Sequence, residues 1–230
     1  MPAPSIREFA DNAVDPKVRG YLHVPDSPNN DALILTHGAG SSSTSPLLVA
    51  LAETFSANGF TVLRCDLPYR QSRSFGPPGP GDAARDRAGL KNALAAMRKI
   101  TPGRLFLGGH SYGGRQSSML CAELSGKKKE EVPDLVAALL LLSYPLHPPR
   151  KPEQQRTQHL PDLRTPTLFV HGTRDPFGSI AELEQALKMI PAKTKLLSVE
   201  GAGHDLGFKG KAKREDLTAT VLAAFTEFLS

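Results

Sequence analysis

Residues 105–114 read Leu105-Phe106-Leu107-Gly108-Gly109-His110-Ser111-Tyr112-Gly113-Gly114. A short apolar run, typical of a strand, leads here into a segment with helical spacing, and Gly-x-Ser-x-Gly falls at the junction. A strand that turns this sharply into a helix holds its serine in a strained backbone conformation and exposes the hydroxyl. Glycines on both sides let the chain pass close to itself. The stretch therefore predicts a strand–turn–helix unit with Ser111 as a nucleophile.

The rest of the chain alternates short apolar runs with longer amphipathic ones. Strands are expected at residues 32–36, 60–64, 105–107, 135–143, 167–170 and 195–199, with an antiparallel edge strand at 19–24. Helices are expected at 47–55, 82–100 (with Asp82 as a cap), 112–124, 179–189 and 215–229, and an irregular loop at 71–81. Continuous Leu, Val and Ile runs suit strands that helices cover on both faces. This order predicts a single α/β domain over residues 1–230, a doubly wound, mostly parallel sheet flanked by helices.

Length and composition exclude several other classes of protein. The chain has 230 residues, of which 40% are hydrophobic and 22% charged, near the globular average and unlike a disordered chain. No apolar run approaches the roughly 20 residues that a membrane span needs, and the N-terminus does not resemble a signal peptide. Cys65 and Cys121 are too few for a disulfide framework. We expect two buried thiols, a cytoplasmic protein and no membrane partner.

The formal charge of +5 is concentrated in two short basic clusters, at residues 127–129 and 209–214. Glu130 and Glu131 follow the first cluster at once, and no zinc-finger, RNP or helix-turn-helix pattern accompanies either. Both clusters are interpreted as solvated surface, so no nucleic-acid partner is expected. No dinucleotide fingerprint, P-loop or metal-ligand spacing is found, and no cofactor or metal is expected. The sequence makes no prediction about oligomeric state.

A second glycine-containing turn, Thr36-His37-Gly38-Ala39-Gly40, ends the strand expected at 32–36. Its Ala39 N–H and the N–H of Tyr112 are the two donors that an oxyanion hole beside Ser111 would use. The alternative is an ordinary turn at the end of a strand. His37 is interpreted as a residue that stabilises this turn rather than as a catalytic base, because it precedes Ser111 and directly follows a buried strand.

An acid and a histidine follow the last two expected strands. Asp175 comes just past one strand and His204 just past the next, so Ser111, Asp175 and His204 follow one another in the order nucleophile, acid, base. Open α/β sheets place their sites at the carboxyl ends of strands. The alternatives are a turn-capping aspartate before a proline and a surface histidine, with Asp162 or Glu200 as the acid instead.

Taken together, the 37–40 turn, the 109–113 motif, Asp175 and His204 resemble the α/β-hydrolase superfamily over residues 18–229. The compact length resembles its dienelactone-hydrolase-like and small carboxylesterase branches, which have no sizeable cap domain. Three stretches resemble the testis-expressed and NSL-complex-subunit-three type of hydrolase-like domain, namely residues 64–69, 143–149 and 171–177. Dienelactone hydrolases carry a cysteine where this chain has Ser111, so the resemblance does not extend to cleavage of such lactones.

The resemblance and the residues together imply a serine hydrolase of the carboxylesterase kind. It would cleave a small ester or thioester through a Ser-His-Asp triad and an acyl-enzyme intermediate. The alternatives are an amidase or peptidase, which the same triad supports, and a non-catalytic binding or scaffold module that kept the fold.

Two groups of mostly basic residues are expected near the site. Tyr69, Arg70 and Arg73 follow a strand end and are placed near the site mouth. The short, proline-rich connection 145–166 carries Arg150, Lys151 and Arg156, interpreted as a solvated basic loop with an acidic substrate as the alternative. The connection is too short for a helical cap, so we expect a shallow, open site that favours short acyl groups.

Overall fold

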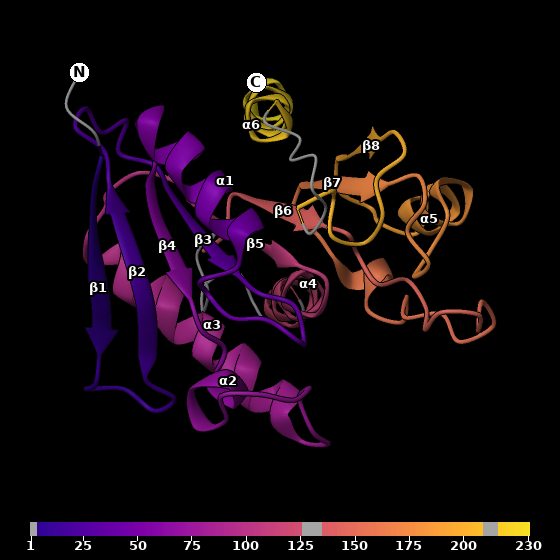
Figure 1. The fold of residues 1–230 in the computed structure, drawn as a ribbon, viewed down its shortest axis with the longest axis horizontal. Coiled ribbons are helices and arrows are strands. Elements are labelled where there is room, and N and C mark those ends of the chain that lie inside the picture. The colour runs from indigo at the N-terminus through magenta and orange to yellow at the C-terminus, as the bar shows by residue number, and fades with distance from the viewer. Residues whose placement is uncertain (1–3, 126–134, 209–215) are drawn as a thin grey trace.

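The computed structural model describes residues 4–125, 135–208 and 216–230 (Figure 1). Its strands form one eight-stranded sheet, ordered β1-β2-β4-β3-β5-β6-β7-β8. They are β1 (Ser5–Asp11), β2 (Val18–Val24), β3 (Ala32–Thr36), β4 (Thr61–Cys65), β5 (Leu105–His110), β6 (Ala138–Leu142), β7 (Thr167–Gly172) and β8 (Thr194–Val199). The β1–β2 and β2–β4 pairs are antiparallel and all other pairs are parallel. Both basic clusters, and the expected helix start at 215, lie outside the described residues.

Helices cover both faces of this sheet, which confirms the doubly wound α/β prediction. They are α1 (Pro46–Ala57), α2 (Pro68–Ser72), α3 (Asp82–Arg98), α4 (Tyr112–Ser125), the 3₁₀ turn η1 (Leu160–Asp162), α5 (Ile180–Leu187) and α6 (Leu217–Leu229). The buried side chains of α1 and α6 pack in one core cluster and those of α3, α4 and α5 in another. Figure 1 shows α1 and α6 above the sheet and α2 and α3 below it.

The helices on both faces of the sheet explain why the central strands are apolar throughout. Every residue of β3, β4 and β6 is buried, so no alternation of apolar and polar residues is needed. Helix α1, expected at 47–55, ends at Ala57 with Asn58 as its C-cap, and Gly59 follows at a φ of 92° that suits glycine. Helix α5 begins with a capping box between Ser179 and Glu182.

The N-terminal edge of the sheet differs from the prediction. Residues 19–24 were expected as an edge strand, but β1 pairs along the whole of β2 and forms the edge instead. β1 has the sequence SIREFAD and is largely exposed, so its backbone pairing, rather than apolar alternation, holds it in place. A strand of this kind leaves little hydrophobic pattern to detect.

Two local expectations are wrong in detail. The first residues of the loop expected at 71–81 belong to the short helix α2, and the first residue of this helix is a proline. The cap of α3 is Gly81 rather than Asp82, which lies in the first helical turn. The Asp82 carboxylate instead accepts hydrogen bonds from the Gly79 N–H and from the Arg73 guanidinium, so it closes the loop before the helix.

The chain reverses its winding direction between two adjacent strands. From β3 the chain passes through α1 to β4 on one side, and then through α3 to β5 on the other side of β3. Thr36 at the end of β3 lies directly beside Gly109 of β5. A crevice forms at the carboxyl ends of strands where the order reverses, and the turns after β3 and β5 both open into it.

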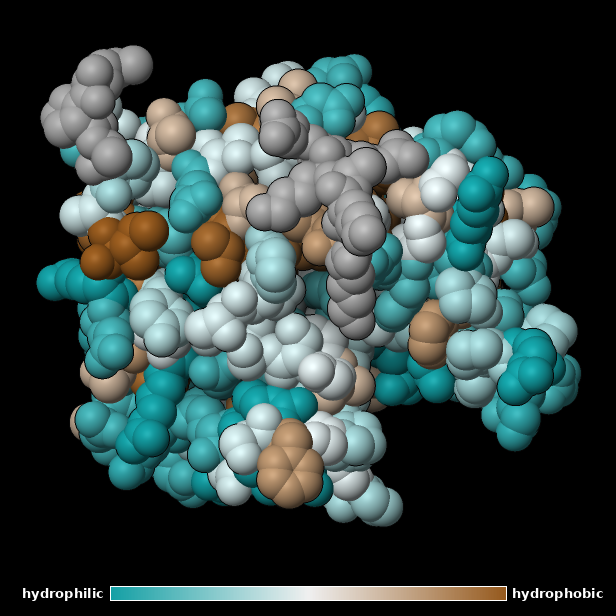
Figure 2. Space-filling view, viewed as in Figure 1, coloured by the Kyte–Doolittle hydropathy of each residue, from teal (hydrophilic) through white to brown (hydrophobic). Residues whose placement is uncertain are grey.

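The surface carries no broad apolar patch on the face seen in Figure 2, as far as the described residues show. The large exposed hydrophobic residues are scattered, with Ile6 at one edge strand and Phe75 at the tip of the loop before α3. No described helix is both long and apolar enough to span a bilayer. Cys65 and Cys121 are buried, as expected, and burial raises the pKa of both thiols to about 12.

Candidate active site

Ser111 lies at the turn between β5 and α4 in the strained conformation that its motif predicts. Its φ is 51°, in the left-handed region, and its N–H donates to the Leu142 carbonyl oxygen (2.8 Å). A Cβ at Gly109 would lie 2.7 Å from the Thr36 carbonyl oxygen, and one at Gly113 2.5 Å from that of His37. Since real Cβ atoms do not approach so closely, both positions require glycine, and the turn holds the Ser111 side chain at the crevice.

The three residues expected at the site form one hydrogen-bonded chain. The Nδ1–H of His204 donates to Asp175 Oδ2 (2.8 Å), which leaves Nε2 as an acceptor, and the Ser111 hydroxyl donates to Nε2 (2.8 Å). Asp175 follows β7 and His204 follows β8. Neither Asp162 in η1 nor Glu200 in the turn after β8 is bonded to His204. This arrangement lets the imidazole take a proton from the serine hydroxyl.

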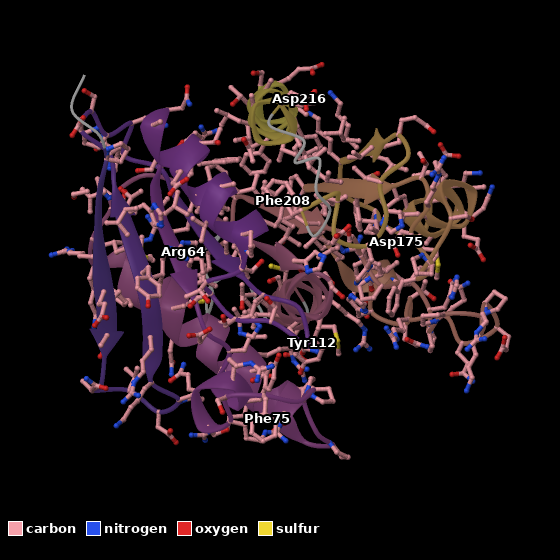
Figure 3. All side chains as sticks on the ribbon, viewed as in Figure 1. Arg64, Phe75, Tyr112, Asp175, Phe208 and Asp216 are labelled. Atoms are coloured by element: carbon pink, nitrogen blue, oxygen red, sulfur yellow. The ribbon has the colours of Figure 1, made fainter. Side chains whose placement is uncertain are left out.

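Neighbouring groups fix the acid and the histidine in position. The Asp175 side chain is fully buried, and its Oδ1 accepts the Phe177 N–H (2.9 Å). The Phe177 ring packs on the His204 imidazole with ring centres 4.2 Å apart. His110 Nε2 is hydrogen-bonded to the His204 carbonyl oxygen (2.7 Å), so His110 positions the loop that carries the imidazole. In Figure 3, Asp175, Tyr112 and Phe208 lie around the middle of the molecule and come from three different segments.

The turn after β3 is held by the residues that sequence reasoning placed near the mouth of the site. Leu67 N–H donates to His37 Nε2 (3.1 Å), so Nδ1 carries the proton and donates to the Gly38 carbonyl oxygen (2.9 Å). Burial lowers the pKa of His37. The Tyr69 hydroxyl and the Arg70 guanidinium donate to the Ala39 carbonyl oxygen (2.8 and 3.1 Å). The geometry agrees with a neutral His37 that stabilises the turn. Tyr69 and Arg70 are buried and hold this turn in place, so they do not form the mouth of the site.

One buried carboxylate, which the sequence analysis missed, links the two turns at the site. Asp86 on α3 is fully buried; its Oδ2 accepts the Tyr112 hydroxyl (2.7 Å) and its Oδ1 accepts the Tyr69 N–H (3.0 Å). Burial raises the pKa of this carboxyl group, although both hydrogen bonds oppose the shift. Asp86 thus ties the first residue of α4 to the tyrosine that holds the Ala39 turn. In the sequence, Asp86 could have been identified because its spacing from Gly89, Leu90 and Ala93 places it on the apolar face of the helix.

The candidate site opens into a cavity of about 570 Å³, within the range of small-molecule sites. Ser111, His204, Ala39 and Tyr112 all line it. Its apolar walls include Leu47, Pro77, Pro78, Phe177 and Phe208. The loop at 71–81 therefore forms part of the cavity wall. The sequence analysis, which expected a shallow site, did not assign this role to the loop.

Of the five basic residues considered from the sequence, the cavity includes one, Arg156, and leaves out four. Arg156 lines it together with Arg115, whereas Arg150 and Lys151 are exposed outside it. Arg73 pairs with Asp82. The connection from residue 145 to residue 166 is described throughout and contains no helix except η1, so the expected lack of a cap domain is confirmed.

The sheet has eight strands and is mostly parallel, a serine lies at a strand-to-helix turn, and an acid and a histidine follow later strands. This combination defines the α/β-hydrolase class. A model of the α/β hydrolase domain family matches residues 29–229. The chain therefore belongs to the α/β hydrolase family, and the expected resemblance to its members without a cap domain is confirmed.

Solved structures with the same fold cover nearly the whole chain. A dienelactone hydrolase from Anabaena variabilis is 22% identical with a TM-score of 0.74, covering 99% of this chain and 98% of its own. An α/β serine hydrolase without lid from Xanthomonas campestris is 17% identical with a TM-score of 0.72, covering 99% of this chain and 96% of its own. At these identities the likeness shows the fold.

One curated relative matches a short segment of the chain. Polyketide synthase ThaQ of Burkholderia thailandensis is 50% identical over 48 residues, which are 21% of this chain and 2% of that protein. The chain thus spans a very small part of that relative's length, and the activity of the whole synthase does not carry over to it.

Proposed function

We propose that the protein is a serine hydrolase that cleaves a small ester or thioester, with Ser111 as nucleophile, His204 as base and Asp175 as the acid that orients it. The observation that carries the proposal is the unbroken chain of 2.8 Å hydrogen bonds from Ser111 Oγ through His204 to Asp175. Each group in this chain has the partner that nucleophilic catalysis requires.

In the first half of the reaction, Ser111 Oγ attacks the substrate carbonyl carbon as its proton passes to His204 Nε2. Asp175 stabilises the imidazolium that forms and remains ionised itself. The negative charge on the carbonyl oxygen is met by the N–H groups of Ala39 and Tyr112. Tyr112 opens α4, and the first four N–H groups of a helix have no partner within it. The positive end of the helix adds to this stabilisation.

Collapse of the tetrahedral intermediate breaks the ester bond, and His204 returns the proton to the departing alcohol or thiol. The acyl group is then bound to Ser111 Oγ. Water attacks this acyl-enzyme with His204 as base, which releases the acid and restores the serine. The sequence of steps uses the protein's own side chains and water.

We expect a fluorophosphonate probe to label the wild-type protein at Ser111, because an activated serine oxygen displaces fluoride from phosphorus. Ser111→Ala should remove the label. Ser125→Ala, at the other end of α4, is the matched control and should label like wild type. Labelling is read by gel fluorescence and located by peptide mass spectrometry. Absence of label on the folded wild-type protein would favour the non-catalytic binding module instead.

Acyl chains longer than a few carbons should give little further gain in kcat/KM. Each buried CH₂ contributes about 0.8 kcal/mol, or roughly a fourfold gain, but a cavity of about 570 Å³ without a cap domain leaves the end of a long chain in water. The measurement is a p-nitrophenyl ester series from acetate to palmitate, below the micelle threshold. A steep preference for palmitate would contradict this expectation.

A further inference from the structure

Two arginines line the cavity beside Ser111. Arg115 lies one helical turn after Ser111 on α4, and its N–H donates to the Ser111 carbonyl oxygen (2.9 Å). Arg156 reaches the cavity from the connection between β6 and β7. The two arginines therefore line the cavity that contains Ser111 from two different elements.

Neither arginine has an acidic partner among the described residues. No ion pair between Arg115 or Arg156 and a carboxylate occurs within the described part of the chain. Arg87, the third cation in this region, differs because it pairs with Glu123 at 2.7 Å. Among the described lining residues, the acidic side chain is Asp205, which follows His204 and accepts the Gly207 N–H (3.0 Å). Among the described lining residues, the cavity wall therefore carries two arginines and one aspartate, a net positive charge.

The main chain, rather than an opposite charge, holds Arg156 in place. Its N–H donates to the Leu146 carbonyl oxygen (2.8 Å), and its carbonyl oxygen accepts the Tyr144 hydroxyl (2.8 Å). The guanidinium makes a longer hydrogen bond to the Pro145 carbonyl oxygen (3.3 Å). Tyr144 is fully buried, so these hydrogen bonds fix the main chain of Arg156 beside the cavity, and within the described residues its guanidinium bonds to the Pro145 carbonyl oxygen.

The electrostatic setting of the two arginines is unfavourable. Burial and, next, the charge of Arg115 lower the pKa of Arg156. Burial and the same Arg115 charge lower the pKa of the neighbouring His159 to about 4, so this imidazole is neutral. Like charges that converge in a partly buried cavity repel each other more strongly than in water. An anion between them would reverse this cost.

We propose that Arg115 and Arg156 bind a carboxylate of the substrate, so that the protein acts on esters or thioesters of short dicarboxylic acids. This inference rests on the proposed hydrolase function, which places the ester carbonyl at Ser111. The planar guanidinium fork matches a carboxylate and forms short, charge-assisted hydrogen bonds with it. Ser111 and both arginines line one cavity of about 570 Å³, so a chain of a few carbons between the two carboxyl carbons would place the ester at Ser111 and the free carboxylate at the arginines.

Binding to Ser111→Ala protein tests this site without any dependence on turnover. Monoethyl glutarate carries one carboxylate, and diethyl glutarate is its neutral counterpart. We expect the monoester to bind about tenfold to a hundredfold more tightly, the range for hydrogen bonds to a charged group. Dissociation constants are measured by NMR or calorimetric titration at fixed ionic strength. Equal affinities for the two compounds would overturn the proposal.

Two variants in the same Ser111→Ala background assign the preference to Arg156. Arg156→Gln should reduce the affinity ratio towards one, whereas Arg156→Lys, which keeps the charge, should retain part of it. Lys151→Gln removes an exposed cation from the same connection and should leave the ratio at the level of the parent protein. An unchanged ratio in a folded Arg156→Gln protein would overturn the role of Arg156. If fluorophosphonate does not label the wild-type protein while Ser111→Ala protein still prefers the monoester, the carboxylate site is retained and the hydrolase function is rejected.

Discussion

Replacement of Ser111 or His204 by alanine is expected to reduce kcat/KM for a short p-nitrophenyl ester by about 10⁴-fold or more. Without the Ser111 oxygen no acyl-enzyme forms, and without His204 Nε2, 2.8 Å away, the serine hydroxyl keeps its proton. The double variant should lose little more than either single variant, because residues that act as one unit are not additive.

Steady-state kinetics after subtraction of the uncatalysed rate measures these losses. Circular dichroism checks that each variant is folded, and Ser125→Ala is the matched serine control on α4. If the losses of the two single variants multiply in the double variant, the two residues act independently and the triad assignment is wrong.

Asp175→Asn is expected to lower kcat by about 10³–10⁴-fold. The carboxylate is bonded on both sides, with Oδ1 accepting the Phe177 N–H and Oδ2 accepting His204 Nδ1–H. In asparagine the oxygen stays opposite the Phe177 N–H, so the amide NH₂ faces Nδ1. The imidazole proton then moves to Nε2, where it blocks transfer of the Ser111 proton. The substituted side chain also removes the anion that stabilises the imidazolium.

Kinetics of Asp175→Asn should be compared with Asp162→Asn and Glu200→Gln, which change the two other acids considered from the sequence. Both controls should retain the wild-type rate, since neither acid is bonded to His204. A full rate in Asp175→Asn, with a large loss in one of the controls, would transfer the role of the acid to that residue.

Most of the parallel sheet was predictable because its strands are continuous apolar runs separated by helices. The errors concern features with weak local patterns. β1 is exposed and held by backbone pairing. The cap of α3 is Gly81, and the sequence analysis assigned this role to the adjacent Asp82 because aspartate is a common capping residue. Such features depend on what the segment meets in space, so a residue pattern predicts them poorly.

The sequence by itself determined which residues stand at the carboxyl ends of the strands. Ser111, Asp175 and His204 were identifiable because each directly follows an apolar run, and parallel strands bring those positions to one edge. Only the tertiary structure decided which side chains hold these three residues in place and which charged residues line the cavity. Asp86 joins Tyr69 to Tyr112 across three helices, and Arg115 and Arg156, from α4 and the 145–166 connection, line one cavity. The reason is physical: strand ends are set by local pattern, whereas hydrogen bonds and charges between distant segments depend on how helices pack.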